Sequence, residues 1–190
     1  MSLQKFNIRN VVLILMIIAA AAMRLVSYKF PVLSNFTPVG AMAIFGGVYF
    51  NDKWKAYLVP FAALFVSDLV INYMYFSKLI IFGGAIWMYL SFFAMVFLGS
   101  LIKKVNVTSV FLASLGGVAI HWLLTDIEPW LSSNVYSKGI AGYFQSLAAA
   151  IPFELNMLKG DIVFGAILFG AFELAKSRYA VLRNKRELAF

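Results

Sequence analysis

The sequence of 190 residues contains no cysteine and only one histidine, His121. The missing cysteine excludes disulfides, thiolate metal ligands and a cysteine nucleophile. A single histidine cannot build a multi-histidine metal centre. The chain also has no phosphate-binding glycine loop, zinc-protease motif or serine-hydrolase elbow. We therefore expect neither catalysis nor a bound metal or cofactor.

Charged residues are scarce as well. They make up 13% of the chain, whereas apolar residues make up 63%. A soluble domain has about 45–50% apolar and about 25% charged residues, so these few charges could not cover a water-exposed surface. The composition predicts an all-α polytopic membrane helix bundle, a single transmembrane domain over residues 1–190, with the lipid bilayer around it.

The apolar runs are long enough to predict where the chain crosses the membrane. Crossing the hydrocarbon core takes about 20 residues of helix. Six spans are predicted, at about residues 11–28, 38–50, 56–76, 79–102, 105–125 and 160–182. The uncharged segment 139–153 is short for a span, and we interpret it as a re-entrant or interfacial helix; a spanning helix stays open as the alternative.

The net charge of +8 fits this count. With the N-terminus inside, eleven of the sixteen lysines and arginines fall on the cytoplasmic side, as the positive-inside rule requires. The other five are Arg24, Lys29, Lys78, Lys138 and Lys159. We expect a bacterial inner-membrane protein with both termini cytoplasmic, and nucleic acid is not needed to explain the charge.

The polar residues of the predicted spans gather in the outer half of the membrane. Polar groups are costly in hydrocarbon and usually mark a site or a helix contact. Arg24 and Tyr28 share one helix face, as do Asp68 and Asn72, because each pair is four residues apart. The predicted substrate-binding residues are Arg24, Tyr28, Asn35, Thr37, Asp68, Asn72, Trp87, His121, Trp122, Asp126, Glu154 and Asn156.

These residues suggest a pocket for a small, anionic or ring-containing molecule. Arg24 would hold an anionic group, His121 would orient the ligand, and Trp87 and Trp122 would stack on a ring. Structural roles remain open alternatives. Arg24 and Asp68 could form an ion pair that only neutralises both charges, and His121 could be a hydrogen-bonded contact between helices.

Small residues form a second group. They allow close approach of helices, and two pairs keep a small-xxx-small spacing. The candidate partner-docking residues are Ala19, Ala22, Ala43, Gly47, Ala166 and Gly170. Packing within the chain is the alternative reading for each of them.

The segment from Asn35 through Thr37-Pro38-Val39-Gly40-Ala41 to Phe50 resembles the signature of an uncharacterised bacterial six-span family. Further matching residues extend the resemblance over nearly the whole chain; they are Arg24, Pro60, Ser67-Asp68, Pro152-Phe153, Asn156, Gly160-Asp161, Phe164 and Leu168-Phe169-Gly170. That family has no function from which a role for this chain would follow.

More distantly, the size, the six spans and the glycine-rich second span resemble the substrate-binding S components of energy-coupling-factor vitamin transporters. This resemblance implies capture of a vitamin-like nutrient from the outer face, with a membrane coupling subunit and two cytoplasmic ATPases as partners. Two alternatives stand beside it. One is a structural or assembly subunit of a larger membrane complex, and the other is an intramembrane enzyme acting through Asp68 and His121.

Overall fold

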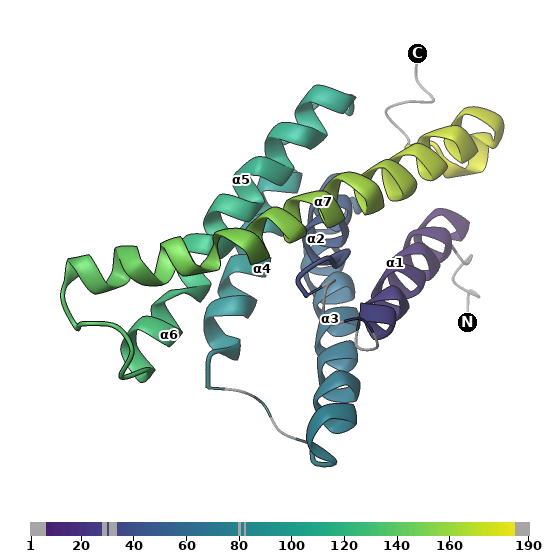
Figure 1. Cartoon of the computed structure of the whole chain (residues 1–190). Coiled ribbons are helices and arrows are strands. Elements are labelled where there is room, and N and C mark those ends of the chain that lie inside the picture. Colours follow the sequence, from purple (N-terminus) through teal and green to yellow (C-terminus); the bar gives the residue numbers. More distant parts are fainter. Residues whose placement is uncertain (1–6, 28–29, 31–33, 80, 82, 185–190) are drawn as a thin grey trace.

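The computed structural model describes residues 7–27, 30, 34–79, 81 and 83–184. All regular structure in these ranges is helical, as the composition predicts. The elements are α1 (Ile8–Ser27), α2 (Val39–Tyr49), α3 (Lys53–Phe76), α4 (Ala85–Ser100), α5 (Val107–Thr125), α6 (Ile127–Ser132), α7 (Ile140–Arg178) and the short 3₁₀ helix η2 (Ala180–Leu182). Figure 1 shows α2 near the centre, with α7 running obliquely across the molecule.

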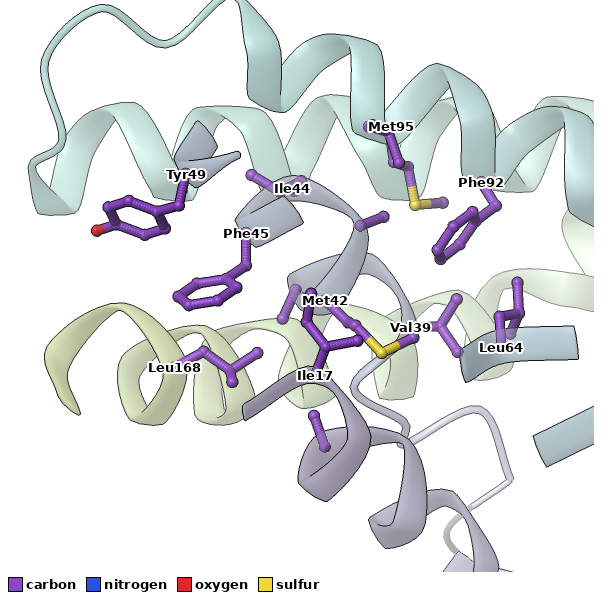
Figure 2. Packing of buried hydrophobic residues seen from close by; sticks show 14 of the residues in the cluster. Ile17, Val39, Met42, Ile44, Phe45, Tyr49, Leu64, Phe92, Met95 and Leu168 are labelled. Atoms are coloured by element: carbon purple, nitrogen blue, oxygen red, sulfur yellow. The ribbon is translucent and has the colours of Figure 1, made fainter. Parts of the chain in front are cut away.

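The short helix α2 is the centre of the packing. Ten of its eleven residues are buried, and it contacts α1, α3, α4, α5 and α7. A helix that is apolar on every side needs neighbours all around it, and α2 has them. Figure 2 shows Met42, Ile44 and Phe45 of α2 packed among side chains from the surrounding helices, including Ile17, Met95 and Leu168.

Glycines let α4 approach α2 backbone to backbone. A Cβ atom on Gly47 would lie 2.1 Å from the carbonyl oxygen of Val96, and one on Gly99 would lie 2.3 Å from that of Ile44. Neither position has room for a side chain. Gly47 and its small neighbour Ala43 are buried at this crossing, so this pair packs α2 within the chain and is not free to dock a partner.

Helix α7 differs from the prediction. Segments 139–153 and 160–182 were expected to be separate, but α7 is one helix of 39 residues that contains Pro152. At about 1.5 Å per residue it extends about 58 Å, roughly twice the thickness of a hydrocarbon core. Proline removes one backbone hydrogen bond, but α7 continues through Pro152 and packs against α2, α5 and α6.

Helix α4 also differs from the predicted span over residues 79–102. It begins only at Ala85, directly after Gly83 and Gly84. Glycine is a poor helix former because its backbone loses more conformational freedom on folding than that of any other residue. The remaining 16 residues of α4, like the 11 of α2, are shorter than a membrane helix needs.

Four helical stretches are long and apolar enough to cross a membrane, within the part of the chain that the structure describes. They are Ile8–Leu25, Lys53–Phe76, Val107–Ser132 and Ile140–Arg178. Their outer surfaces carry exposed Leu15, Ile18, Val66, Leu112 and Ile167, each more than half exposed. Six charged side chains, by contrast, are buried: Arg9, Arg24, Asp68, Asp126, Glu154 and Asp161. Such an apolar exterior indicates a membrane protein.

The crossing of α2 and α4 generates the first prediction. Gly47→Ala should destabilise the fold by about 1–3 kcal/mol or more, because the new methyl group meets the Val96 backbone and forces the helices apart. Gly170→Ala is the matched control, since no atom lies within 4 Å of its Cβ position. Thermal unfolding of the purified proteins in detergent compares the two. Equal unfolding temperatures would show that the crossing can relax.

Candidate functional site

A polar cavity of about 500 Å³ opens at the end of the bundle where α3 ends and α4 begins. Its walls come from α3, α4, α5, α6 and α7 and from the segment before α2. The ionisable and hydroxyl groups in its lining include Asp68, Tyr89, His121, Asp126, Ser146 and Glu154. Apolar side chains make up most of the remaining wall, as in a typical small-molecule site.

The cavity lies above a helix that is too short to fill the bundle. Helix α2 extends about 16 Å at the usual rise per residue, and Asn35, three residues before its N-cap Pro38, lines the cavity. Irregular backbone at membrane depth is stable only where protein buries it or where it faces a hydrated cavity. The segment before α2 can therefore be irregular because it faces this cavity, and the cavity exists because α2 is short.

Arg24 of α1 and Asp68 of α3 form a buried ion pair. The Arg24 Nη2 atom lies 2.6 Å from Asp68 Oδ1. Its Nη1 atom donates to the Ser67 hydroxyl at 2.5 Å and to the Leu64 carbonyl at 3.2 Å. Tyr89 of α4 interacts with the same carboxylate. Arg24 thus lies behind Asp68 and does not line the cavity.

A second polar contact joins α5 to α7. His121 Nδ1 lies 3.0 Å from Glu154 Oε1 and 3.2 Å from Oε2. The Glu154 side chain is buried, so the imidazole is its principal polar partner among the described residues. The pair closes one wall of the cavity and joins two helices that are far apart in the sequence.

Asp126 is the cavity carboxylate without a cationic partner. The Ser146 hydroxyl donates to Asp126 Oδ1 at 3.2 Å, but among the described residues no ion pair involves Asp126. The lining holds three carboxylates and one imidazole, and Arg24 already neutralises Asp68. The unpaired charge of the cavity is therefore negative.

The structure brings half of the predicted binding residues into this one lining: Asn35, Asp68, Asn72, His121, Asp126 and Glu154. The others lie elsewhere. Trp122 donates to the Leu147 carbonyl at 2.9 Å, and Asn156 donates to the Ser34 carbonyl at 3.2 Å, so both tie the chain together outside the cavity.

Of three further predicted site residues, two lie within the described part of the chain. Thr37 packs its backbone against Gly160, where a Cβ atom would lie 2.7 Å from the Thr37 carbonyl oxygen. Trp87 is partly buried on α4 and is not part of the lining. Tyr28 lies outside the described residues.

Several lining residues were not predicted, and two of them, Tyr89 and Ser146, interact with the cavity carboxylates. Tyr89 lies in a long run of apolar residues, with which tyrosine is counted. Only its hydroxyl group is polar, and this residue lines the cavity. Ser146 lies in the segment interpreted as a short interfacial helix. The continuous α7 places it against Asp126, and no local sequence signal predicts that contact.

The Arg24–Asp68 pair generates the second prediction. Arg24→Met leaves the Asp68 carboxylate buried without its cation, and breaking a buried pair typically costs about 3–5 kcal/mol. The unfolding temperature in detergent should fall accordingly. Lys55→Met, which breaks the exposed pair with Asp52, is the control and should cost less than about 1 kcal/mol. A wild-type unfolding temperature for Arg24→Met would contradict a stabilising role for the pair.

Comparison with known proteins gives one family. The model of DUF6580, described as a family of unknown function, matches residues 4–183. No curated protein and no solved structure matches the chain. The match covers almost the whole sequence, including every residue that lines the polar cavity. The chain therefore belongs to this family of unknown function, DUF6580.

Proposed function

We propose that this protein is a membrane-embedded binding protein that captures a small organic molecule in the polar cavity. The observation that carries the proposal is the cavity itself. It gathers charged and hydroxyl side chains from separate helices into about 500 Å³, inside a protein with an apolar exterior. A small number of polar groups that converge on an apolar cavity is typical of a site that binds and orients a ligand.

The charges of the cavity favour a ligand with a basic nitrogen. The sequence suggested an anion held by Arg24, but Arg24 already binds Asp68, Ser67 and the Leu64 carbonyl. An anion would have to break these contacts. Asp126, by contrast, has a carboxylate that an ammonium or amidinium group could pair with. Charge-assisted hydrogen bonds of this kind are stronger than neutral ones.

The apolar part of the lining suits a flat or ring-shaped body on the same ligand. Met88, Pro129, Tyr89 and Phe153 lie in the lining together with the carboxylates. Aromatic rings attract cations over their faces and stack on other rings. We therefore expect an amine or amidine attached to a ring, with the ring against these side chains and the basic nitrogen at Asp126.

The proposed topology places the cavity on the outer side of the membrane. Arg9 near the start of α1 donates to the Leu182 carbonyl at 2.9 Å, and this closeness of the two ends of the described chain supports an even number of crossings. Lysines and arginines concentrate at that side, away from the cavity; they include Lys53, Lys55, Lys103, Lys104, Lys176 and Arg178. By the positive-inside rule this side is cytoplasmic.

Six crossings would require α2 and α4 to count as spans together with their flanking segments. Capture from outside then suggests uptake, either by this chain alone or with a membrane coupling subunit and ATPases, as in the S-component type of transporter. An accessory subunit of a membrane complex is the second candidate. It is favoured by an apolar groove of about 580 Å³ between α1 and α3, whose walls include the small residues Ala21, Ala22, Ala62 and Ala63.

Catalysis by Asp68 and His121 is not favoured by the contacts of either residue. Asp68 is paired with Arg24, and His121 is paired with Glu154. A general base or nucleophile needs a free position facing the substrate. Asp68 is already engaged by Arg24, and the Glu154 contact orients the His121 imidazole through Nδ1 without joining it to Asp68.

Ligand-dependent stabilisation tests the proposed function. Ring-containing amines and amidines should raise the unfolding temperature of the purified protein, whereas matched carboxylic acids should not. Asp126→Asn keeps the acceptor for Ser146 but removes the charge. It should weaken binding at least about tenfold, which corresponds to about 1.4 kcal/mol.

Asp52→Asn, an exposed carboxylate outside the cavity, is the control variant and should bind as the wild type does. Stabilisation by carboxylic acids alone would favour Arg24 as the anchor and overturn the preference for a base. If no compound of either class stabilises the protein, the proposed function fails.

A further inference from the structure

A second cavity, of about 420 Å³, lies between α5 and α7. We call it the lower cavity, because it extends toward the end of the bundle opposite the polar cavity. Its walls are almost entirely apolar and include Val110, Phe111 and Phe169. Two carboxylates interrupt this apolar lining, Asp161 and Glu173.

Asp161 lies in the interior of the bundle and faces the N-terminus of α2. Its side chain is 1% exposed. The Oδ1 atom accepts a hydrogen bond from the Ala41 backbone N–H at 2.8 Å, one of the first-turn N–H groups that a helix cannot satisfy itself. The Oδ2 atom is buried and forms no hydrogen bond of regular geometry, although the Gly40 backbone N–H also acts on the carboxylate.

The carboxylate is held in this position by glycine. A Cβ atom on Gly40 would lie 2.2 Å from Asp161 Oδ2, so only glycine allows the carboxylate to press against α2. Glycine at position 40 thus leaves the space that the Asp161 carboxylate occupies. The Oδ2 atom is a buried acceptor on a residue that borders a cavity.

Three carboxylates of the described helices have charged or titratable partners, and Asp126 accepts a hydrogen bond from the Ser146 hydroxyl. Asp68 is paired with Arg24, Glu154 with His121, and Glu173 lies 2.8 Å from Lys176 Nζ and 2.6 Å from the Tyr49 hydroxyl. Asp161 forms no ion pair among the described residues. An isolated buried charge is expensive, and a proton on the carboxylate removes that cost.

We propose that Asp161 is a proton-binding residue, with the proton carried on Oδ2 and exchanged through the lower cavity. The partial positive charge at the α2 N-terminus stabilises the ionised form, and the apolar surroundings stabilise the neutral form. The same residue can therefore exist in two protonation states without any change in its hydrogen bond from Ala41.

The charged groups around Asp161 are few. Glu154 lies seven residues earlier on α7, about 10 Å along the helix axis, and acts on Asp161 electrostatically. Glu173 lines the lower cavity together with Asp161, with Tyr49 and Lys176 bound to it. Helix α5 contributes His121 at the polar cavity, whereas its residues at the lower cavity, such as Ser114, are uncharged.

Because Glu154 lines the polar cavity, the charge state of Asp161 affects the electrostatic potential where a ligand would bind. Proton binding would in this way be linked to ligand binding, a connection that rests on the proposed function. The protonation of Asp161 itself does not rest on the proposed function. It can be tested without any ligand of the polar cavity, so the two proposals can fail separately.

Dicyclohexylcarbodiimide, an apolar reagent, tests the protonation. A protonated carboxyl group gives its proton to one carbodiimide nitrogen, its oxygen bonds to the central carbon, and an acyl shift then yields a stable N-acylurea with no leaving group. In detergent-purified protein, peptide mass spectrometry should find this product at Asp161. The yield should fall at least tenfold between about pH 5 and about pH 9, as the protonated fraction of the carboxyl falls.

Glu173 is the internal control, because it borders the same cavity but is paired with Lys176 and Tyr49. It should stay unmodified. Asp161→Asn places an amide N–H₂ where the protonated oxygen lies, so the variant should keep the unfolding temperature that the wild type has at low pH. Asp161→Ala, which also loses the acceptor for Ala41, should unfold at a lower temperature.

If the reagent fails to react, infrared spectroscopy tests whether Asp161 is protonated. A carbonyl band of a protonated carboxyl that is present in the wild type and absent from Asp161→Asn supports the proposal whether or not the reagent reaches the site. No such band, or equal modification of Glu173 and Asp161, overturns it. A large loss of stability in Asp161→Asn at every pH would also overturn it, because Asp161 would then act only as an ionised cap of α2.

Discussion

The burial of α2 is the constraint on which the other elements depend. A wholly apolar helix of eleven residues can be surrounded only if its neighbours approach closely and its N-terminal N–H groups find an acceptor inside the protein. Glycines at the α2–α4 crossing meet the first condition, and the Asp161 carboxylate meets the second. Because Gly40 and Gly160 bring α7 against α2 and the segment before it, the same contact fixes the course of the longest helix.

The polar groups follow from this arrangement. A half-length central helix leaves a volume above its N-terminus, and the polar cavity lies there, with walls from the ends of the longer helices. Two carboxylates of its lining pair across helices, Asp68 with Arg24 and Glu154 with His121, whereas Asp126 forms no ion pair among the described residues. The interior thus holds a few polar groups beside its apolar core, while the surface is apolar, an arrangement that suits a bilayer.

Several features could be read from the sequence because each depends on a local property. Helices α1, α3 and α5 begin and end within about three residues of the predicted spans, since a long apolar run bounded by charged residues determines such a helix. The shared depth of Asp68, Asn72, His121, Asp126 and Glu154 also followed from the span count. Their convergence on one cavity needed only that the helices pack in parallel or antiparallel.

Other features depended on contacts between residues far apart in the chain. The sequence by itself indicated a membrane protein, determined the helical architecture and predicted a grouping of polar residues, because composition and apolar run length are properties of each segment alone. Only the tertiary structure decided that Pro152 lies within one continuous α7, that Arg24 is engaged by Asp68, and that Asp161 caps α2 from a position 120 residues beyond Ala41. The physical reason is that the energies of these contacts come from burial and pairing between helices, which no single segment contains.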